Sequence, residues 1–183
     1  MKALILGGVR SGKSRHAEEL AARHRGPIAL IATARAGDEE MAARIAAHRA
    51  RRPDHWRVIE EPITLGRALL ELARPDSCVI IDCLTLWLTN ILMQSDAQLL
   101  ERECDALLAA VQAAAGAVIL VSNEVGSGII PVNELARRFC DATGSLHQRL
   151  AQACDRVVLM VAGLPLTVKP PAAIGRYVQG GRA

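Results

Sequence analysis

Gly7-Gly8-Val9-Arg10-Ser11-Gly12-Lys13-Ser14 follows directly on a short apolar run, Lys2 to Leu6, and precedes a stretch compatible with a helix. The spacing G-x-x-x-x-G-K-S between a strand and a helix is typical of a P-loop, in which backbone N–H groups and a helix N-terminus point at bound phosphates. Gly7 and Gly12 let the backbone approach the phosphates. Lys13 then reaches the β- and γ-phosphates, and the Ser14 hydroxyl can ligate Mg²⁺. A glycine-rich turn that matches by accident is the alternative, but the context favours a nucleoside triphosphate site.

Apolar runs rich in β-branched residues alternate with helical stretches along the chain. Nearly continuous apolar runs are typical of strands covered on both faces, and the repeated strand–helix order predicts a mostly parallel sheet. We therefore expect an α/β, single-domain P-loop NTPase (RecA-like) fold with helices on both faces and a site at the carboxyl ends of the strands. The domain should span 1–169, with an irregular tail at 170–183. The predicted strands are 2–6, 28–33, 56–59, 78–82, 117–122 and 156–161, and the predicted helices are 14–24, 38–51, 63–73, 84–93, 97–115 and 133–152.

The composition excludes several other classes of protein. The 183 residues are 51% apolar, only 2% aromatic and carry a formal charge of +3, a balance that requires neither a nucleic-acid nor a membrane partner. No apolar run reaches the length of a membrane span, and no signal peptide is visible. The five cysteines show no metal-type pairing. We expect a cytoplasmic protein with reduced thiols.

Asp82 ends the apolar run Val79-Ile80-Ile81. P-loop enzymes hold Mg²⁺ on an acid at this place, directly or through water, because hard oxygen ligands suit a cation that bridges phosphates. The alternative is that Asp82 caps the helix that begins near Leu84. One residue can serve both roles, and we favour the metal role.

His48 lies in a predicted helix among arginines, with Arg44 one turn before it and Arg49, Arg51 and Arg52 shortly after. Positive neighbours disfavour the protonated imidazole, and a neutral histidine beside anionic phosphates is a candidate nucleophile. The arginines could hold the triphosphate under attack. The alternative is that His48, which the helical spacing places on the packing face, packs at the helix end while the arginines form a solvated face.

Asn123 and Glu124 follow the predicted strand 117–122 and precede Gly126 and Gly128. Ligands are expected at this end of the sheet, so the pair could orient substrate or Mg²⁺. Equally, the pair could belong to a loop held by the two glycines. The other histidines lack arginine-rich surroundings and are expected at the surface or at the edge of the core: His16, His24, His55 and His147.

Four segments match one family in the same order along the chain. They run from Gly7 to Glu18 (GGxRSGKSRHAE), from Asp38 to His48 (DEEMAARIxxH), from Arg52 to Trp56 (RPxHW) and from Ser122 to Pro131 (SNEVGxGIxP). The chain resembles the bifunctional adenosylcobinamide kinase / adenosylcobinamide-phosphate guanylyltransferase family of cobalamin biosynthesis over about residues 1–169. The P-loop alone is generic, whereas the four segments together are highly specific.

The resemblance implies phosphorylation of adenosylcobinamide by ATP or GTP, then transfer of GMP from GTP to adenosylcobinamide phosphate through a covalent GMP adduct on His48. Lys13 and His48 are then catalytic, and Ser14 and Asp82 hold Mg²⁺, although some relatives carry Glu at the position of Asp82. Some relatives also have a second histidine where this chain has Ala47. A homo-oligomer, a trimer in relatives, is implied, without nucleic acid or a membrane span. The implied nucleotide contacts are Gly7, Gly8, Val9, Arg10, Ser11, Gly12, Lys13, Ser14, Thr33, Ala34, Arg35, Arg49, Ala50, Arg51, Arg52, Glu60 and Asp82.

Two other interpretations stay open at this point. The chain could be a P-loop small-molecule kinase with a single activity, in which the helix that carries His48 is only a lid. It could also be a RecA-like ATPase module of an oligomeric assembly on nucleic acid or protein. The nearly balanced charge and the scarcity of aromatic platforms for bases disfavour that reading.

Overall fold

Strands and helices alternate along most of the chain, as the sequence predicts. In the computed structural model the described residues are 1–35, 37, 39–51 and 53–171, and the side chains of Met41, Arg44, His48 and Arg51 are not among them. The strands are β1 (Lys2–Gly7), β2 (Ile28–Ala32), β3 (Arg57–Glu60), β4 (Cys78–Asp82), β5 (Ala117–Val121), β6 (Arg156–Val161) and β7 (Leu164–Lys169). The helices are α1 (Lys13–Ala21), α2 (Glu39–Arg51), α3 (Leu65–Leu72), α4 (Leu84–Leu92), α5 (Leu99–Ala113) and α6 (Glu134–Ala153).

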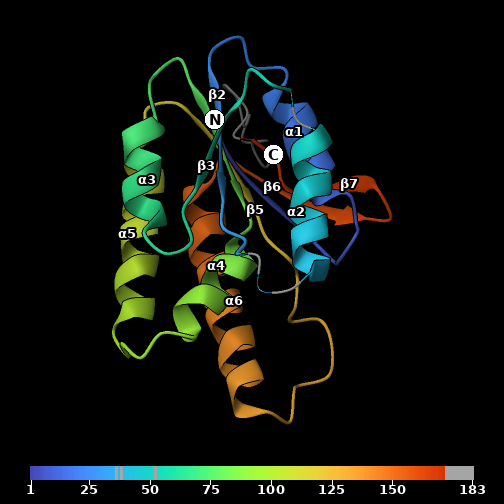
Figure 1. Ribbon diagram of the computed structural model, residues 1–183, viewed down its shortest axis with the longest axis vertical. Helices are drawn as coiled ribbons and strands as arrows, with labels where there is room; N and C mark the ends of the chain where they lie inside the picture. The colour runs from blue at the N-terminus through green and yellow to red at the C-terminus, as the bar shows by residue number, and fades with distance from the viewer. Residues whose placement is uncertain (36, 38, 52, 172–183) are drawn as a thin grey trace, which may run out of the picture.

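Over the described residues, the strands form one sheet in the order β3-β2-β4-β5-β1-β6-β7 (Figure 1). Neighbouring strands are parallel except β6 and β7, which are antiparallel. The predicted α/β fold with a mostly parallel sheet is confirmed. β5 lies between β1 and β4, with Leu120 opposite both Leu4 and Ile81. The segments that follow these three strands therefore leave the sheet at the same edge, which is where the P-loop and Asp82 lie.

Both faces of the sheet are buried, which explains the nearly continuous apolar strands. In Figure 1, α3 and α5 lie on one side of the sheet and α1 and α2 on the other. Successive strand residues alternate between the two cores: Leu4 packs with the apolar side chains of α3 to α6, and Ile5 packs with those of α1. Among the described helices, none combines the length and hydrophobicity that crossing a bilayer requires.

The predicted helix 14–24 ends early, at Ala21. His24 turns the chain there, because its N–H donates to the Ala21 carbonyl and its Nδ1 accepts from the N–H of Gly26 at 3.1 Å. A ring that takes a local backbone donor in this way competes with helix continuation.

β7 is the strand that the sequence pattern misses. A two-residue turn at Ala162 and Gly163 joins it to β6, with φ of 51° and 84°. A turn with two positive φ values usually carries Asn-Gly or Asp-Gly, so Ala162-Gly163 gives a weak signal. β7 is an edge strand that contains Pro165 and lacks an alternating pattern of burial. The tail beyond 171 lies outside the described residues, and the domain boundary at 169 stays a prediction.

Gly66 lies where the backbone of α3 packs tightly against that of α5. A Cβ at Gly66 would lie 2.7 Å from the carbonyl carbon and oxygen of Ala106, which are backbone atoms that cannot rotate away. We expect Gly66→Ala to lower the free energy of unfolding by about 1–3 kcal/mol through overpacking. Gly144→Ala in α6 is the matched control, because a Cβ there meets nothing within 4 Å. Urea unfolding should show Gly144→Ala unchanged or stabilised by up to about 1 kcal/mol; equal effects of the two substitutions would contradict the packing argument.

Candidate active site

The P-loop wraps tightly between β1 and α1. Gly12 has φ of 96° and directly precedes the first residue of α1. Gly7 has φ of 150°, and a Cβ on it would lie 2.5 Å from the carbonyl oxygen of Met160 and 2.6 Å from the Ser11 Oγ. These two positions therefore require glycine, as the motif predicts. Ser11 Oγ is itself buried and makes no hydrogen bond with a described residue.

Lys13 is folded back into the loop. Its Nζ donates a hydrogen bond to the Gly8 carbonyl at 2.6 Å, and only 7% of the residue is exposed. Burial lowers the pKa of Lys13, while the Coulomb effect of Cys83 and Asp82 acts in the opposite direction. A bound triphosphate would favour the protonated form in the same way, so the lysine and the phosphates stabilise each other.

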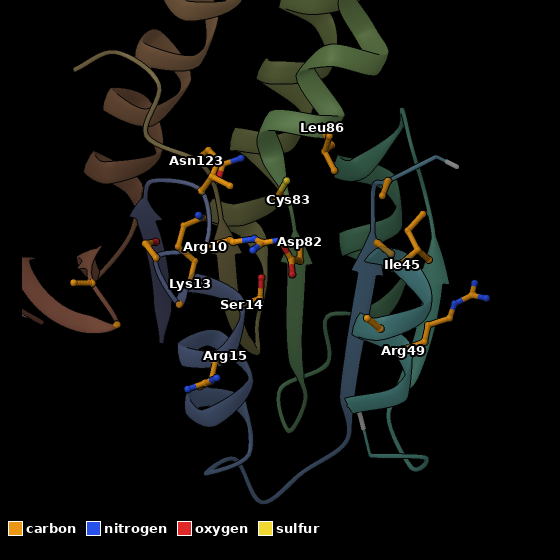
Figure 2. A pocket seen from close by; sticks show the side chains of 18 of the residues that line it. Arg10, Lys13, Ser14, Arg15, Ile45, Arg49, Asp82, Cys83, Leu86 and Asn123 are labelled. Carbon is orange, nitrogen blue, oxygen red and sulfur yellow. The ribbon is translucent and has the colours of Figure 1, made fainter. Parts of the chain in front are cut away.

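A cavity of about 710 Å³ lies at the carboxyl edge of the sheet, between the P-loop and α2 (Figure 2). This volume falls within the range of small-molecule sites. Of the residues predicted from the sequence, it brings together Val9, Arg10, Ser11, Gly12, Lys13, Ser14, Ala34, Arg49, Glu60 and Asp82. The predicted contacts Gly7, Gly8, Thr33, Arg35 and Ala50 are not among the described residues that line it. Further lining residues are Arg15, Ala32, Ile45, Ala47, Cys83, Leu86, Asn123, Ala162 and Gly163.

Thr33 ties the end of β2 to the end of β4. Its buried hydroxyl donates to the Cys83 carbonyl at 2.7 Å and accepts from the Cys83 N–H at 2.9 Å. Cys83, rather than Asp82, is the N-cap residue of α4, and it makes no side-chain capping bond. The alternative prediction that Asp82 caps this helix is therefore wrong, and its carboxylate faces the cavity (Figure 2).

The donor set at this edge suits Mg²⁺. Figure 2 shows the Ser14 hydroxyl and the Asp82 carboxylate in the same part of the cavity. Within the described part of the chain, no three His, Cys, Asp or Glu side chains gather into a metal cluster. Mg²⁺ at phosphate sites is usually held by one or two protein oxygens together with phosphates and water, so a hydroxyl and one carboxylate are an adequate set.

The opposite wall of the cavity comes from α2 and β3. Arg49 and Glu60, two predicted nucleotide contacts, form an ion pair across these elements. Figure 2 shows the Arg49 side chain pointing away from Lys13. Ala47 and Arg49, which flank His48 in the sequence, both line the cavity. The side chains of His48 and Arg51, and the whole of Arg52, lie outside the described part of the chain.

Asn123 and Glu124 have different roles. The Glu124 carboxylate accepts from the Gly126 N–H at 2.6 Å and pairs with the Ser127 hydroxyl at 3.3 Å, so it organises its own loop. Asn123 instead lines the cavity, and its Nδ2 donates to Thr85 Oγ1 at 3.0 Å. The loop interpretation is therefore confirmed for Glu124, whereas orientation of substrate or Mg²⁺ stays a prediction for Asn123.

His147 of α6 contacts the residue that follows β5. It was expected at the surface or core edge, but it is buried, and its Nε2 lies 2.7 Å from the Oγ of fully buried Ser122. Burial lowers the pKa of His147, and the nearby Glu124 carboxylate partly opposes this effect. The buried residues of α6 are Thr143, Leu146, His147 and Leu150, at the spacing i, i+3, i+4, i+7. That spacing is the sequence signal that could have placed His147 in the core.

A family model described as "Cobinamide kinase / cobinamide phosphate guanyltransferase" matches residues 3–168. The chain belongs to this family. Bifunctional adenosylcobalamin biosynthesis protein CobP of Pseudomonas aeruginosa is 54% identical over 92% of this chain and 98% of that protein. The CobU proteins of Escherichia coli and Salmonella typhimurium are 40% and 42% identical, over 92% of this chain and 100% of theirs. The predicted family resemblance is confirmed.

Solved structures that are similar to this cobinamide kinase family member show the same architecture. A Pyrococcus horikoshii protein has a TM-score of 0.55 at 10% identity, covering 92% of this chain and 86% of its own. The RadB recombinase has a TM-score of 0.50 at 16% identity, covering 86% and 73%. At these identities the likeness concerns the fold alone, and it confirms the predicted RecA-like P-loop architecture.

The stability of this family member should fall on mild acidification, because the native state disfavours protonation of His147. A histidine whose native pKa lies below its ordinary value of 6.5 stabilises the fold fully above that pH. The contribution is lost as the pH falls from 6.5 towards the native pKa. We expect His147→Gln to make the free energy of unfolding less dependent on pH between about 7.5 and 5.5, each unit of pKa difference being worth ~1.4 kcal/mol. Urea unfolding at several pH values measures this slope.

His55→Gln is the control for this experiment, because His55 is exposed. It should keep the wild-type dependence on pH. A His147→Gln variant with an unchanged slope would show that protonation of His147 is not linked to folding.

Proposed function

We propose that this chain phosphorylates cobinamide, in the adenosylcobinamide form that the resemblance implies, with ATP or GTP. It then transfers GMP from GTP to the resulting cobinamide phosphate through an adduct on His48. The observation that carries the proposal is the cavity, which has the P-loop on one wall and the two neighbours of His48, Ala47 and Arg49, on the other. Membership of a family described by both activities favours this function over a kinase of single activity or an ATPase module.

In the kinase step, a hydroxyl oxygen of cobinamide attacks the γ-phosphorus. The bond to the β,γ-bridging oxygen breaks, with its electron pair on the departing nucleoside diphosphate. Lys13 and the N–H groups of the P-loop hold the phosphates, and such positioning supplies most of the catalysis in phosphoryl transfer. Bound Mg²⁺, held by Ser14 and Asp82, would neutralise charge on the phosphate oxygens.

In the transferase step, an imidazole nitrogen of His48 attacks the α-phosphorus of GTP and pyrophosphate leaves. A phosphate oxygen of cobinamide phosphate then attacks the same phosphorus and releases the imidazole, which gives cobinamide-GDP. Two displacements of moderate barrier replace a single difficult one. Lys13 and the arginines from Arg49 to Arg52 are suited to hold the charge that develops on pyrophosphate.

One P-loop serves both reactions in this proposal. The described cavity contains a single P-loop, and the two steps differ in which phosphorus is attacked rather than in the ligand that is held. A triphosphate seated on Lys13 has its γ-phosphate transferred in the first step. In the second step it presents its α-phosphate to α2.

We further propose that the protein acts in the cytoplasm as a homo-oligomer, a trimer by the resemblance. Exposed apolar side chains support an association surface, because patches of this kind often mark interfaces. They gather in the loop before α6 and along β7: Ile129, Ile130, Val132, Leu164, Leu166 and Val168.

The covalent intermediate gives the most direct test of this function. Incubation with α-labelled GTP and Mg²⁺ should label the wild-type protein with GMP in an acid-labile bond, because phosphoramidates hydrolyse in acid. His48→Ala should abolish the label and leave more of the kinase activity than of the transferase activity. Lys13→Ala should reduce both half-reactions by at least about tenfold, since it removes the cation that the phosphates bind.

Lys2→Ala is the control lysine substitution, because Lys2 binds the Gln112 carbonyl at 2.9 Å, outside the cavity. Absence of label in well-folded wild-type protein would contradict the proposed guanylyltransferase activity. Equal loss of both activities in folded His48→Ala would make His48 structural.

A further inference from the structure

Asn123 lies at the end of the strand between the P-loop strand and the strand that carries Asp82. It follows β5, which separates β1 from β4 in the sheet, and its side chain lines the same cavity as Lys13 and Asp82. Figure 2 shows it on the opposite side of Lys13 from Ser14. The next residue, Glu124, donates its N–H to the Gly7 carbonyl at 2.9 Å. The backbone of Asn123 is thereby joined to the P-loop itself.

The side chain of Asn123 is held from α4. Its Nδ2 donates to Thr85 Oγ1 at 3.0 Å, and that oxygen lies 3.2 Å from Cys83 Sγ. Thr85 is 4% exposed, so water competes little for this bond. The preceding residue, Ser122, is fixed as well, because its buried Oγ lies 2.7 Å from His147 Nε2. The bond to Thr85 therefore restrains the side chain of Asn123, and the bond to His147 restrains the residue before it.

The remaining polar atom is the side-chain carbonyl of Asn123. With Nδ2 bound to Thr85, Oδ1 offers two lone pairs, and no hydrogen bond from a described residue reaches it. A carbonyl oxygen cannot bond a phosphate oxygen, because both are acceptors. It can accept from a hydroxyl, and the acceptor of the kinase step carries one that must lie next to the γ-phosphate and therefore next to the P-loop. The neighbouring carboxylate of Glu124 is engaged with its own loop.

We propose that Asn123 is a catalytic residue whose side-chain carbonyl accepts a hydrogen bond from the attacking hydroxyl of the alcohol substrate, and that Thr85 is its positioning residue. The inference rests on the proposed kinase function and adds the residue that aims the nucleophile. The hydroxyl oxygen forms its bond to the γ-phosphorus as the bond to the departing nucleoside diphosphate breaks. The hydroxyl proton is released to solvent, because a neutral amide orients a nucleophile without serving as its base.

The test separates orientation of the acceptor from binding of the nucleotide. We expect Asn123→Ala to lower kcat for cobinamide phosphorylation by about 10- to 100-fold, the scale on which misplacement of a reactant acts. The KM for ATP should change by less than about twofold, since the P-loop is intact. GMP labelling of His48, which needs GTP but no cobinamide hydroxyl, should keep its wild-type rate.

Thr85 supplies a matched pair of variants. Thr85→Val removes the hydroxyl at similar volume and should lower the kinase kcat in the same direction as Asn123→Ala. Thr85→Ser keeps the hydroxyl and should restore most of the activity. Urea unfolding of all variants confirms that each is folded before its kinetics are compared.

The outcomes distinguish this inference from the proposed function. A folded wild type without phosphorylation of cobinamide would overturn the kinase function itself. An active wild type with an unchanged kcat in Asn123→Ala would overturn the role of Asn123 alone. Equal losses of phosphorylation and GMP labelling in Asn123→Ala would show that the residue supports the nucleotide site instead, and would also overturn the inference.

Discussion

The P-loop depends on main-chain hydrogen bonds that hold it from both sides. From β5, the Glu124 N–H bonds the Gly7 carbonyl at 2.9 Å, and from the β6–β7 turn, the Gly163 N–H bonds the Ser11 carbonyl at 3.0 Å. Both bonds follow from the parallel sheet, which delivers the ends of β1, β5 and β6 to the same edge. The phosphate site is thus built from backbone positions that the strand order fixes. The same strand order determines where the side chains of Lys13 and Asp82 lie.

The features that the sequence alone predicts are those with a local signal. The P-loop needs two glycines and a lysine at fixed spacing, and Asp82 ends a strand whose apolar run is plain to read. The sequence alone could not separate the contacts of Asn123 from those of Glu124, because only the fold shows that Asn123 faces the cavity while Glu124 binds its own loop. The absence of arginine neighbours says nothing about burial, so it could not place His147, whose helical spacing with the buried residues of α6 puts it in the core. β7 could not be predicted, because an exposed edge strand lacks the alternating apolar pattern that identifies a half-buried strand.

In the proposed function, the two reactions require different groups around a triphosphate in the same P-loop. Phosphoryl transfer needs an acceptor hydroxyl aimed at the γ-phosphorus, and the end of β5, next to the P-loop, is the side from which Asn123 can aim it. Guanylyl transfer needs a nucleophile at the α-phosphorus, and α2 lines the opposite wall of the cavity. In the proposed function, a triphosphate held by its β- and γ-phosphates in the P-loop would present its α-phosphate to that wall. In this proposal, groups at the end of β5 act on the γ-phosphate and groups on α2 act on the α-phosphate, because these phosphates lie at opposite ends of the triphosphate chain.

We propose that one P-loop holds the triphosphate in both reactions. The most direct measurement is the rate of GMP labelling of the wild-type protein by α-labelled GTP, against rising concentrations of the β,γ-imido analogue of ATP, which cannot donate its γ-phosphate. A shared P-loop predicts competitive inhibition, with an inhibition constant equal to the dissociation constant of the analogue and to its inhibition constant in the kinase assay. Labelling that continues at the uninhibited rate when the analogue saturates the P-loop would contradict it and require a second triphosphate site.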